Sequence, residues 1–233
     1  MHFKKNFFFF VLLFSISVFA QKNFILKQVI LEAPSLSPAT LNQLQWIPGT
    51  DEFSYLEETE SGINLVAEQI EAGNKKILTT LDDLNNSLAY AALDSATNFP
   101  RFSWHSSGEI WFWQKNKLVL FNIQKNKLFV LNEITEGGGN HDFIVPEKIA
   151  YTIDNNLFIA DNSNQIKVTN DENSSIVNGK SVHRVEFGIT KGTFWSPNSN
   201  YLAFYSKDET MVTDYPLVDV TQKPATLINN KSP

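Results

Sequence analysis

Hydrophobic and polar residues alternate along most of this chain in short runs. The clearest unit lies between Trp195 and Tyr205, where the polar segment 196–200 separates two stretches rich in aromatic and apolar residues. Pro197 presets φ for the first central position of a tight turn, and the asparagines after it tolerate turn and left-handed conformations. This pattern predicts two antiparallel strands joined by a turn.

Rougher copies of this unit recur upstream, each marked by one aromatic residue before a polar turn. The four marker aromatics are Trp46, Trp104, Phe143 and Trp195. Short turns such as Lys115–Asn116 and Lys125–Asn126 divide the copies into strands, which predicts antiparallel four-stranded meanders. One meander cannot bury both of its faces, so such units stack about an axis as blades. We therefore predict an all-β chain of about four β-propeller blades; a twisted β-sandwich is the alternative.

Two further segments carry a weaker pattern. Residues 24–31 alternate enough to predict a first strand. Residues 82–96 place Leu84 and Leu88 at helical spacing, but the segment is also rich in Asn and Asp. It is therefore compatible with either a helix or a loop.

Composition narrows the class of protein. With 233 residues, 42% of them hydrophobic, the chain is long enough to bury a sizeable core. A net charge of -6 argues against a nucleic-acid partner, because a run of phosphates would need a basic surface. The absence of cysteine excludes disulfides, thiolate metal ligands and a cysteine nucleophile.

The first twenty residues have the pattern of a signal peptide. Lys4 and Lys5 precede an apolar run over 7–14, and 18–20 form a small-residue cleavage site. The apolar run is too short to span a bilayer comfortably, so an uncleaved anchor is the weaker alternative. The pattern predicts export to the periplasm or medium, with Met1–Ala20 removed and residues 21–233 forming one propeller portion.

Motifs for catalysis or metal binding are missing from the sequence. It contains no Gly-x-Ser-x-Gly nucleophile elbow. His105, His141 and His183 lie far apart and match no metal-ligand spacing, while Gly137–Gly139 lacks the Lys-Ser/Thr of a phosphate-binding loop. We therefore predict no catalytic residue, no metal site and no cofactor in this chain.

One acidic residue stands in a suggestive place. Residues 183–189 form a short polar arm with an apolar tip just before the last copy begins, and Glu186 lies in its middle. Taken alone, Glu186 is more often an exposed acid paired with Arg184 or Lys191, and such a pair contributes little to stability.

Several segments around this arm resemble one family. They are Glu186–Ile189, Thr193–Pro197, Leu202–Tyr205 and Asp208–Asp219. Together they are similar to the N-terminal propeller of the dipeptidyl peptidase IV family, bacterial branch, within the prolyl oligopeptidase-like serine peptidases. The resemblance is strong over 182–219 and only architectural over 24–180.

The resemblance implies a fold and a role. In that family an irregular eight-bladed propeller covers a C-terminal α/β-hydrolase domain, and glutamates on an arm bind the free α-amino group of the peptide. The resemblance maps the second glutamate onto Glu186, whereas Val185 stands in the place of the first. The chain ends at Pro233, so we expect a partial propeller that lacks the hydrolase domain and cannot hydrolyse peptides alone.

The resemblance also implies the partners. We expect the parent to be a secreted serine exopeptidase that releases Xaa-Pro or Xaa-Ala dipeptides from peptide N-termini, with a homodimer allowed. Two alternatives stay open: the propeller of a prolyl tripeptidyl peptidase, and a non-catalytic β-propeller that serves as a binding or scaffold module.

Overall fold

A computed structural model describes residues 25–31, 40–71, 73–182 and 186–231, so the predicted signal segment 1–20 lies outside the described residues. The chain divides into two compact units, 1–40 and 41–233. In the first unit, Leu26–Leu31 form helix α2 rather than the predicted strand. The apolar residues Leu26, Val29 and Ile30 have the i, i+3, i+4 spacing of a helix. Over the described residues, no helix has the length and apolar character needed to cross a membrane.

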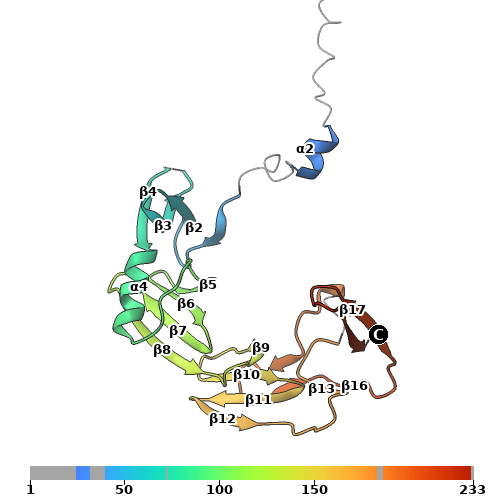
Figure 1. The fold of residues 1–233 in the computed structure, drawn as a ribbon. Helices are drawn as coiled ribbons and strands as arrows, with labels where there is room; N and C mark the ends of the chain where they lie inside the picture. Colours follow the sequence, from blue (N-terminus) through green and yellow to red (C-terminus); the bar gives the residue numbers. More distant parts are fainter. Residues whose placement is uncertain (1–24, 32–39, 72, 183–185, 232–233) are drawn as a thin grey trace, which may run out of the picture. The chain divides into compact units, whose positions relative to one another are not determined.

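The second unit contains three four-stranded antiparallel sheets among its described residues, each built from strands in chain order (Figure 1). The first sheet contains β1 (Asn42–Trp46), β2 (Glu52–Thr59), β3 (Gly62–Gln69) and β4 (Lys75–Thr80). The second contains β5 (Phe102–Ser106), β6 (Glu109–Gln114), β7 (Lys117–Asn122) and β8 (Lys127–Glu133), and the third contains β9 (Gly139–Asp142), β10 (Lys148–Ile153), β11 (Asn156–Asp161) and β12 (Asn164–Lys167). The predicted meanders are confirmed.

Turn chemistry explains these hairpins. Gln114 pairs with Lys117, which leaves Lys115–Asn116 as a two-residue turn, and Lys115 has a φ of 54°. Between β11 and β12, Asn162 and Ser163 both have positive φ, at 47° and 67°. Two-residue turns with positive φ match the right-handed twist of the strands that they join.

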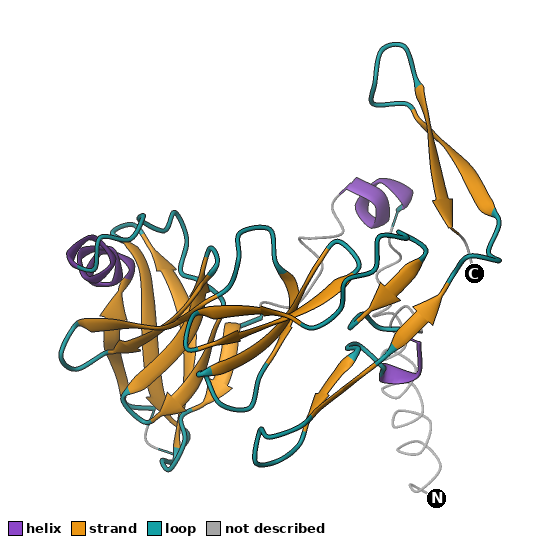
Figure 2. Cartoon of the chain, turned by 90° about the horizontal axis from the view of Figure 1, so that it is seen from below, coloured by secondary structure: helices purple, strands orange, loops and turns teal. Residues whose placement is uncertain are grey.

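The ambiguous segment after β4 is a helix. Helix α4 (Leu81–Tyr90) begins at a capping box, in which the Thr80 hydroxyl accepts from the Asp83 N–H and the Asp83 carboxylate accepts from the Thr80 N–H. Leu84 and Leu88 are fully buried. Helix α4 packs on β3, β4 and β8, and it is the purple helix at the left of Figure 2.

The fourth copy departs from a simple meander. β14 (Thr193–Trp195) pairs with β15 (Leu202–Phe204), as the sequence predicts, but β16 (Ser206–Asp208) pairs instead with β13 (Ile176–Asn178). The switch occurs at Tyr205, whose N–H donates to Gly192 and whose carbonyl accepts from Gly179. A separate hairpin of β17 (Asp214–Asp219) and β18 (Thr226–Lys231) follows.

The turn between β14 and β15 works differently from the prediction. The residue with positive φ is Ser199, at 53°, and not one of the asparagines beside it. Asn198 serves as an acceptor instead, because its side-chain oxygen takes the N–H of Asn200 at 3.2 Å. The Ser196 hydroxyl oxygen accepts from Tyr201 N–H at 3.0 Å and completes the turn.

Two apolar clusters fill the spaces beside the sheets. The larger unites the first two sheets with α4 and includes Leu65, Leu84 and Phe121, each fully buried. The smaller unites the second and third sheets around Leu118 and Tyr151. Each cluster buries apolar side chains from two neighbouring sheets and so holds these sheets together. This packing is expected because one meander cannot bury both of its own faces.

Three marker aromatics contact the preceding sheet. The Trp104 Nε1–H donates to Ser54 Oγ of the first sheet at 2.9 Å. Phe143 lies edge-on to Trp111 of the second sheet, with ring centroids 5.4 Å apart. The Trp195 Nε1–H donates to the backbone oxygen of Asp142 in the third sheet at 3.0 Å. Trp46, on the first strand, is 63% exposed.

The buried contact between the first two sheets can be tested by truncation. We expect Phe121→Ala to lower the free energy of unfolding by about 3–5 kcal/mol, because it removes a fully buried ring and leaves a cavity. Phe129→Ala, on the neighbouring strand, is the matched control: its ring is 43% exposed, so we expect about 0.5 kcal/mol or less. Urea denaturation measures both, and equal losses would contradict this core.

Candidate functional site

The arm predicted from the sequence rises from a stem of two backbone segments, 179–181 and 189–192. The Ser181 hydroxyl donates to the Ile189 carbonyl at 3.1 Å and closes the stem below the arm. At its base the N–H of Gly179 donates to the Tyr205 carbonyl at 2.8 Å, and the Tyr205 N–H donates to the Gly192 carbonyl at 2.9 Å. The two segments are therefore held by the same residue, Tyr205, which lies between β15 and β16.

Gly192 lets the two stem segments touch. A Cβ at this position would lie 2.2 Å from the backbone oxygen of Lys180, which no real side chain can do. Glycine is needed here because any Cβ would collide with the neighbouring backbone, and not because the backbone adopts an unusual φ. The glycine thus fixes how closely the arm's two ends approach.

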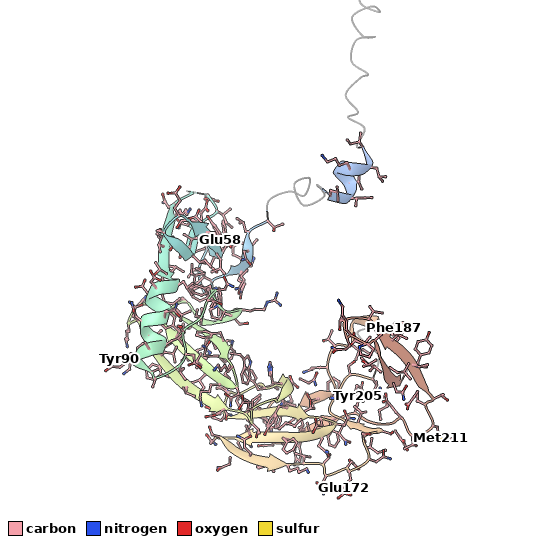
Figure 3. The ribbon with its side chains drawn as sticks, viewed as in Figure 1. Glu58, Tyr90, Glu172, Phe187, Tyr205 and Met211 are labelled. Atoms are coloured by element: carbon pink, nitrogen blue, oxygen red, sulfur yellow. The ribbon has the colours of Figure 1, made fainter. Side chains whose placement is uncertain are left out.

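The tip of the arm is a short 3-10 element, η1 (Glu186–Gly188). Phe187 occupies the left-handed region at φ 55° and is 89% exposed; Figure 3 labels it, together with Tyr205 at the stem base. Glu186 opens the element, but its side chain, like residues 183–185, lies outside the described part of the chain. The role predicted for Glu186 therefore stays a prediction.

Asp142 anchors the stem to the third sheet. Its carboxylate accepts from Lys191 Nζ at 3.0 and 3.1 Å and from the buried Thr193 hydroxyl at 3.1 Å. Its backbone oxygen takes the Trp195 indole N–H. The side chain is 16% exposed, so these charge-assisted bonds form where water competes little.

The Asp142 anchor involves a residue that was also a candidate partner of Glu186. If Glu186 is an ordinary surface acid, Lys191 is one of the two cations with which it could pair. In the structure Lys191 forms a salt bridge with Asp142, and its Nζ also lies 5.5 Å from the centroid of the Phe194 ring. Lys191 therefore serves to hold the stem.

A second anchor ties the opposite stem segment to the third sheet. Lys180 Nζ donates to the Asn155 side-chain oxygen at 2.9 Å, and Asn155 lies in the turn between β10 and β11. The Asn178 N–H donates to the Asn155 backbone oxygen at 3.0 Å. Both sides of the stem are thus fixed to the same sheet before the arm begins.

The two described histidines, His105 and His141, each pack against a tryptophan ring. Of the residues that the structure describes, no three His, Asp, Glu or Cys side chains come together as ligands. His105 lies against Trp111, with ring centroids 5.0 Å apart, and His141 stacks on Trp113 at 4.2 Å. Desolvation lowers the pKa of His141, which favours the neutral ring at neutral pH. His183 lies outside the described residues.

Comparison with known proteins finds a family that resembles this chain over the arm. A family model described as "Dipeptidyl peptidase IV (DPP IV) N-terminal region" matches residues 144–232. This match contains the arm, its stem and the Asp208–Asp219 stretch. The four-stranded antiparallel sheets form a β-propeller segment, and the chain is similar to the N-terminal region of the dipeptidyl peptidase IV family.

Individual relatives agree with this assignment. Probable dipeptidyl-aminopeptidase B proteins of Chaetomium globosum and Neurospora crassa are each 33% identical, over 84 and 85 residues; the match covers 34% of this chain and 9% of each relative. A solved putative dipeptidyl aminopeptidase IV from Bacteroides ovatus is 33% identical with a TM-score of 0.68, covering 84% of this chain and 26% of that one. The solved structure of Porphyromonas gingivalis dipeptidyl peptidase 4 shares the fold, with a TM-score of 0.61 and 18% sequence identity. This match covers 91% of the present chain and 32% of the other.

Sequence reasoning found the arm but missed Asp142. Its partners are 49 to 53 residues away, so no local spacing marks it. The one available signal was the acidic residue immediately before the marker aromatic Phe143.

The anchor can be tested by removing its carboxylate. We expect Asp142→Ala to cost about 1–3 kcal/mol of unfolding free energy, because it leaves the buried Thr193 hydroxyl without its acceptor. Hydrogen exchange at the Gly179 and Tyr205 amides should rise at the same time. The control is Asp94→Ala, which breaks a pair whose side chains are 67% and 71% exposed and should change little. Unchanged amide protection in Asp142→Ala would refute the anchor.

Proposed function

We propose that this chain is the substrate-recognition propeller portion of a secreted serine exopeptidase that releases Xaa-Pro or Xaa-Ala dipeptides from peptide N-termini. The observation that carries the proposal is the arm. A stem fixed on both sides to the third sheet presents η1, and Glu186 opens that element. In this role Glu186 binds the free α-amino group of the peptide.

The chemistry suits such a task. A carboxylate pairs with an ammonium more strongly where water is partly excluded than it does in bulk solvent. A fixed arm also sets a distance, because an amine held at one place determines which peptide bond reaches a nucleophile elsewhere. Anchoring the stem at Asp142 and Asn155 limits how far that place can move. Val185 takes the position of the family's first glutamate, so one carboxylate would act alone.

The remainder of the enzyme belongs to the same proposal. The nucleophile and its partners would come from a C-terminal α/β-hydrolase domain, in keeping with relatives whose names describe dipeptidyl aminopeptidases. The segment Met1–Ala20 would direct export. Prolyl tripeptidyl peptidases release three residues from the N-terminus instead of two. The same arm could serve such an enzyme if the distance between the arm and the nucleophile were different.

A second candidate function is a non-catalytic binding module. It is favoured by the braced arm, because an arm fixed to a sheet can present a binding residue without a catalytic group beside it. The two functions differ in what the arm should recognise. An exopeptidase arm must distinguish a free amino terminus from a blocked one, whereas a general binding module need not.

The amino-group role of Glu186 gives a direct binding prediction. We expect Ala-Pro-Ala amide to bind the chain about tenfold more tightly than its N-acetyl form near pH 7, where the α-amino group is largely protonated. Glu186→Gln should abolish this preference, and Glu172→Gln, at an exposed loop position, should keep it. The preference should also fade by pH 10, because the amine is then neutral. Isothermal titration calorimetry measures each affinity.

Two results would count against this role. Equal affinities for the free and acetylated peptides would favour the binding module. A preference that survives Glu186→Gln would move the amine site to another residue.

A further inference from the structure

An aromatic cleft of about 370 Å³ opens between the second and third sheets. Its walls include Trp111 and Trp113 of β6, Leu118 of β7, and Phe143, which follows β9. The volume falls within the roughly 300–1,000 Å³ of small-molecule sites. Most of the lining is apolar, so the cleft suits a ligand with an apolar or aromatic body.

The side walls of this cleft are held in place. Trp111 contacts His105 on one side and Phe143 on the other, with centroid separations of 5.0 and 5.4 Å. Trp113 stacks on His141 with an interplanar angle of 18°. Because each indole is braced by other rings, the cleft is preformed, which lowers the entropy lost when a ligand binds.

One cation lies on the rim. Arg101 is exposed, lines the cleft and precedes β5. No described carboxylate lies within salt-bridge distance of it, although the chain as a whole has a net charge of -6. A guanidinium presents a planar fork of donors that matches a carboxylate, and it keeps its charge at every physiological pH.

The cleft also adjoins the arm's support. His141, which stacks on Trp113, immediately precedes Asp142, which holds Lys191 of the stem. The last two residues of β9 therefore have different contacts: His141 packs on the cleft wall, and Asp142 holds the stem. The cleft nevertheless uses its own side chains and does not require Glu186.

We propose that this cleft is a binding site for an aromatic or apolar carboxylate, such as the C-terminal residue of a peptide. The carboxylate pairs with Arg101, and the side chain of the ligand packs against Trp111, Trp113 and Phe143. The proposed carboxylate site lies between the second and third sheets, whereas the arm that we propose to bind amino groups is attached to the third sheet. The proposal does not depend on the peptidase assignment.

Three small probes separate the two parts of this site. We expect N-acetylphenylalanine to bind the purified chain saturably. N-acetylphenylalanine amide lacks the charge and N-acetylglycine lacks the ring, so each should bind about tenfold more weakly. Saturation-transfer NMR shows whether the ring of the probe contacts the protein, and isothermal titration calorimetry gives the affinities. None of the probes has a free amino group, so Glu186→Gln should leave their binding unchanged.

Variants then assign the charge. Arg101→Gln should lower the affinity for N-acetylphenylalanine about tenfold, and Arg101→Lys should lower it less, since it keeps the charge but loses the fork. Lys127→Gln is the control: it removes a cation 5.0 Å from the Phe129 ring on the same sheet but away from the cleft, and should have no effect. Because Arg101 is exposed, Arg101→Gln should keep the urea midpoint of the parent.

The proposal is overturned by any of three results. These are the absence of saturable binding, equal affinity for the acid and the amide, and equal affinity of the parent and Arg101→Gln for the acid. Failure of the amino-group test at Glu186 would leave these outcomes unaffected, so the two sites can be judged separately.

Discussion

The structure depends on an aromatic residue that reaches back from each new sheet to the one before it. Trp104 reaches Ser54, Phe143 reaches Trp111, and Trp195 reaches Asp142. Two of these contacts use the indole N–H, and the third uses a ring alone. An aromatic side chain supplies a large apolar surface, and tryptophan adds one directional donor. The repeated contact therefore fixes the position of a sheet as well as burying its face.

The arm depends on the last of these contacts. Asp142 receives the Trp195 indole on its backbone and Lys191 and Thr193 on its carboxylate. The junction that joins the third sheet to β14 is thus also the junction that supports the stem. A second tie through Asn155 limits rotation about the first. The packing of the sheets and the position of the stem depend on the same few groups, which is why an arm can rise from a chain so rich in short strands.

The sequence predicted what local chemistry controls. Turns such as Lys115–Asn116 could be located because Asn, Lys and Gly next to apolar runs mark the ends of strands. The marker aromatics could be found because each occupies the same place relative to its turn. The all-β propeller class, the three meanders and the family relationship are confirmed on this basis. Helix α4 remained ambiguous until Leu84 and Leu88 were seen to be buried, since tertiary packing decides such segments.

The remaining features are set by contacts distant in sequence. The exchange of partners at Tyr205 depends on β13, which lies well upstream of β14 along the chain. The role of Asp142 could not be predicted from local spacing, because its partners lie in another copy of the unit. The error at α2 arose because a short apolar run satisfies both a strand and a helix pattern.

The most direct test of this account compares two single substitutions that remove an indole N–H but keep an aromatic ring. Trp195→Phe should raise hydrogen exchange at the Gly179 and Tyr205 amides several-fold, because one bond to the third sheet is lost beside the stem. Trp46→Phe, at a residue that is 63% exposed, should leave these amides unchanged. If Trp195→Phe left them as protected as in the parent, or if both variants raised exchange equally, the reach-back contact would not be what holds the arm.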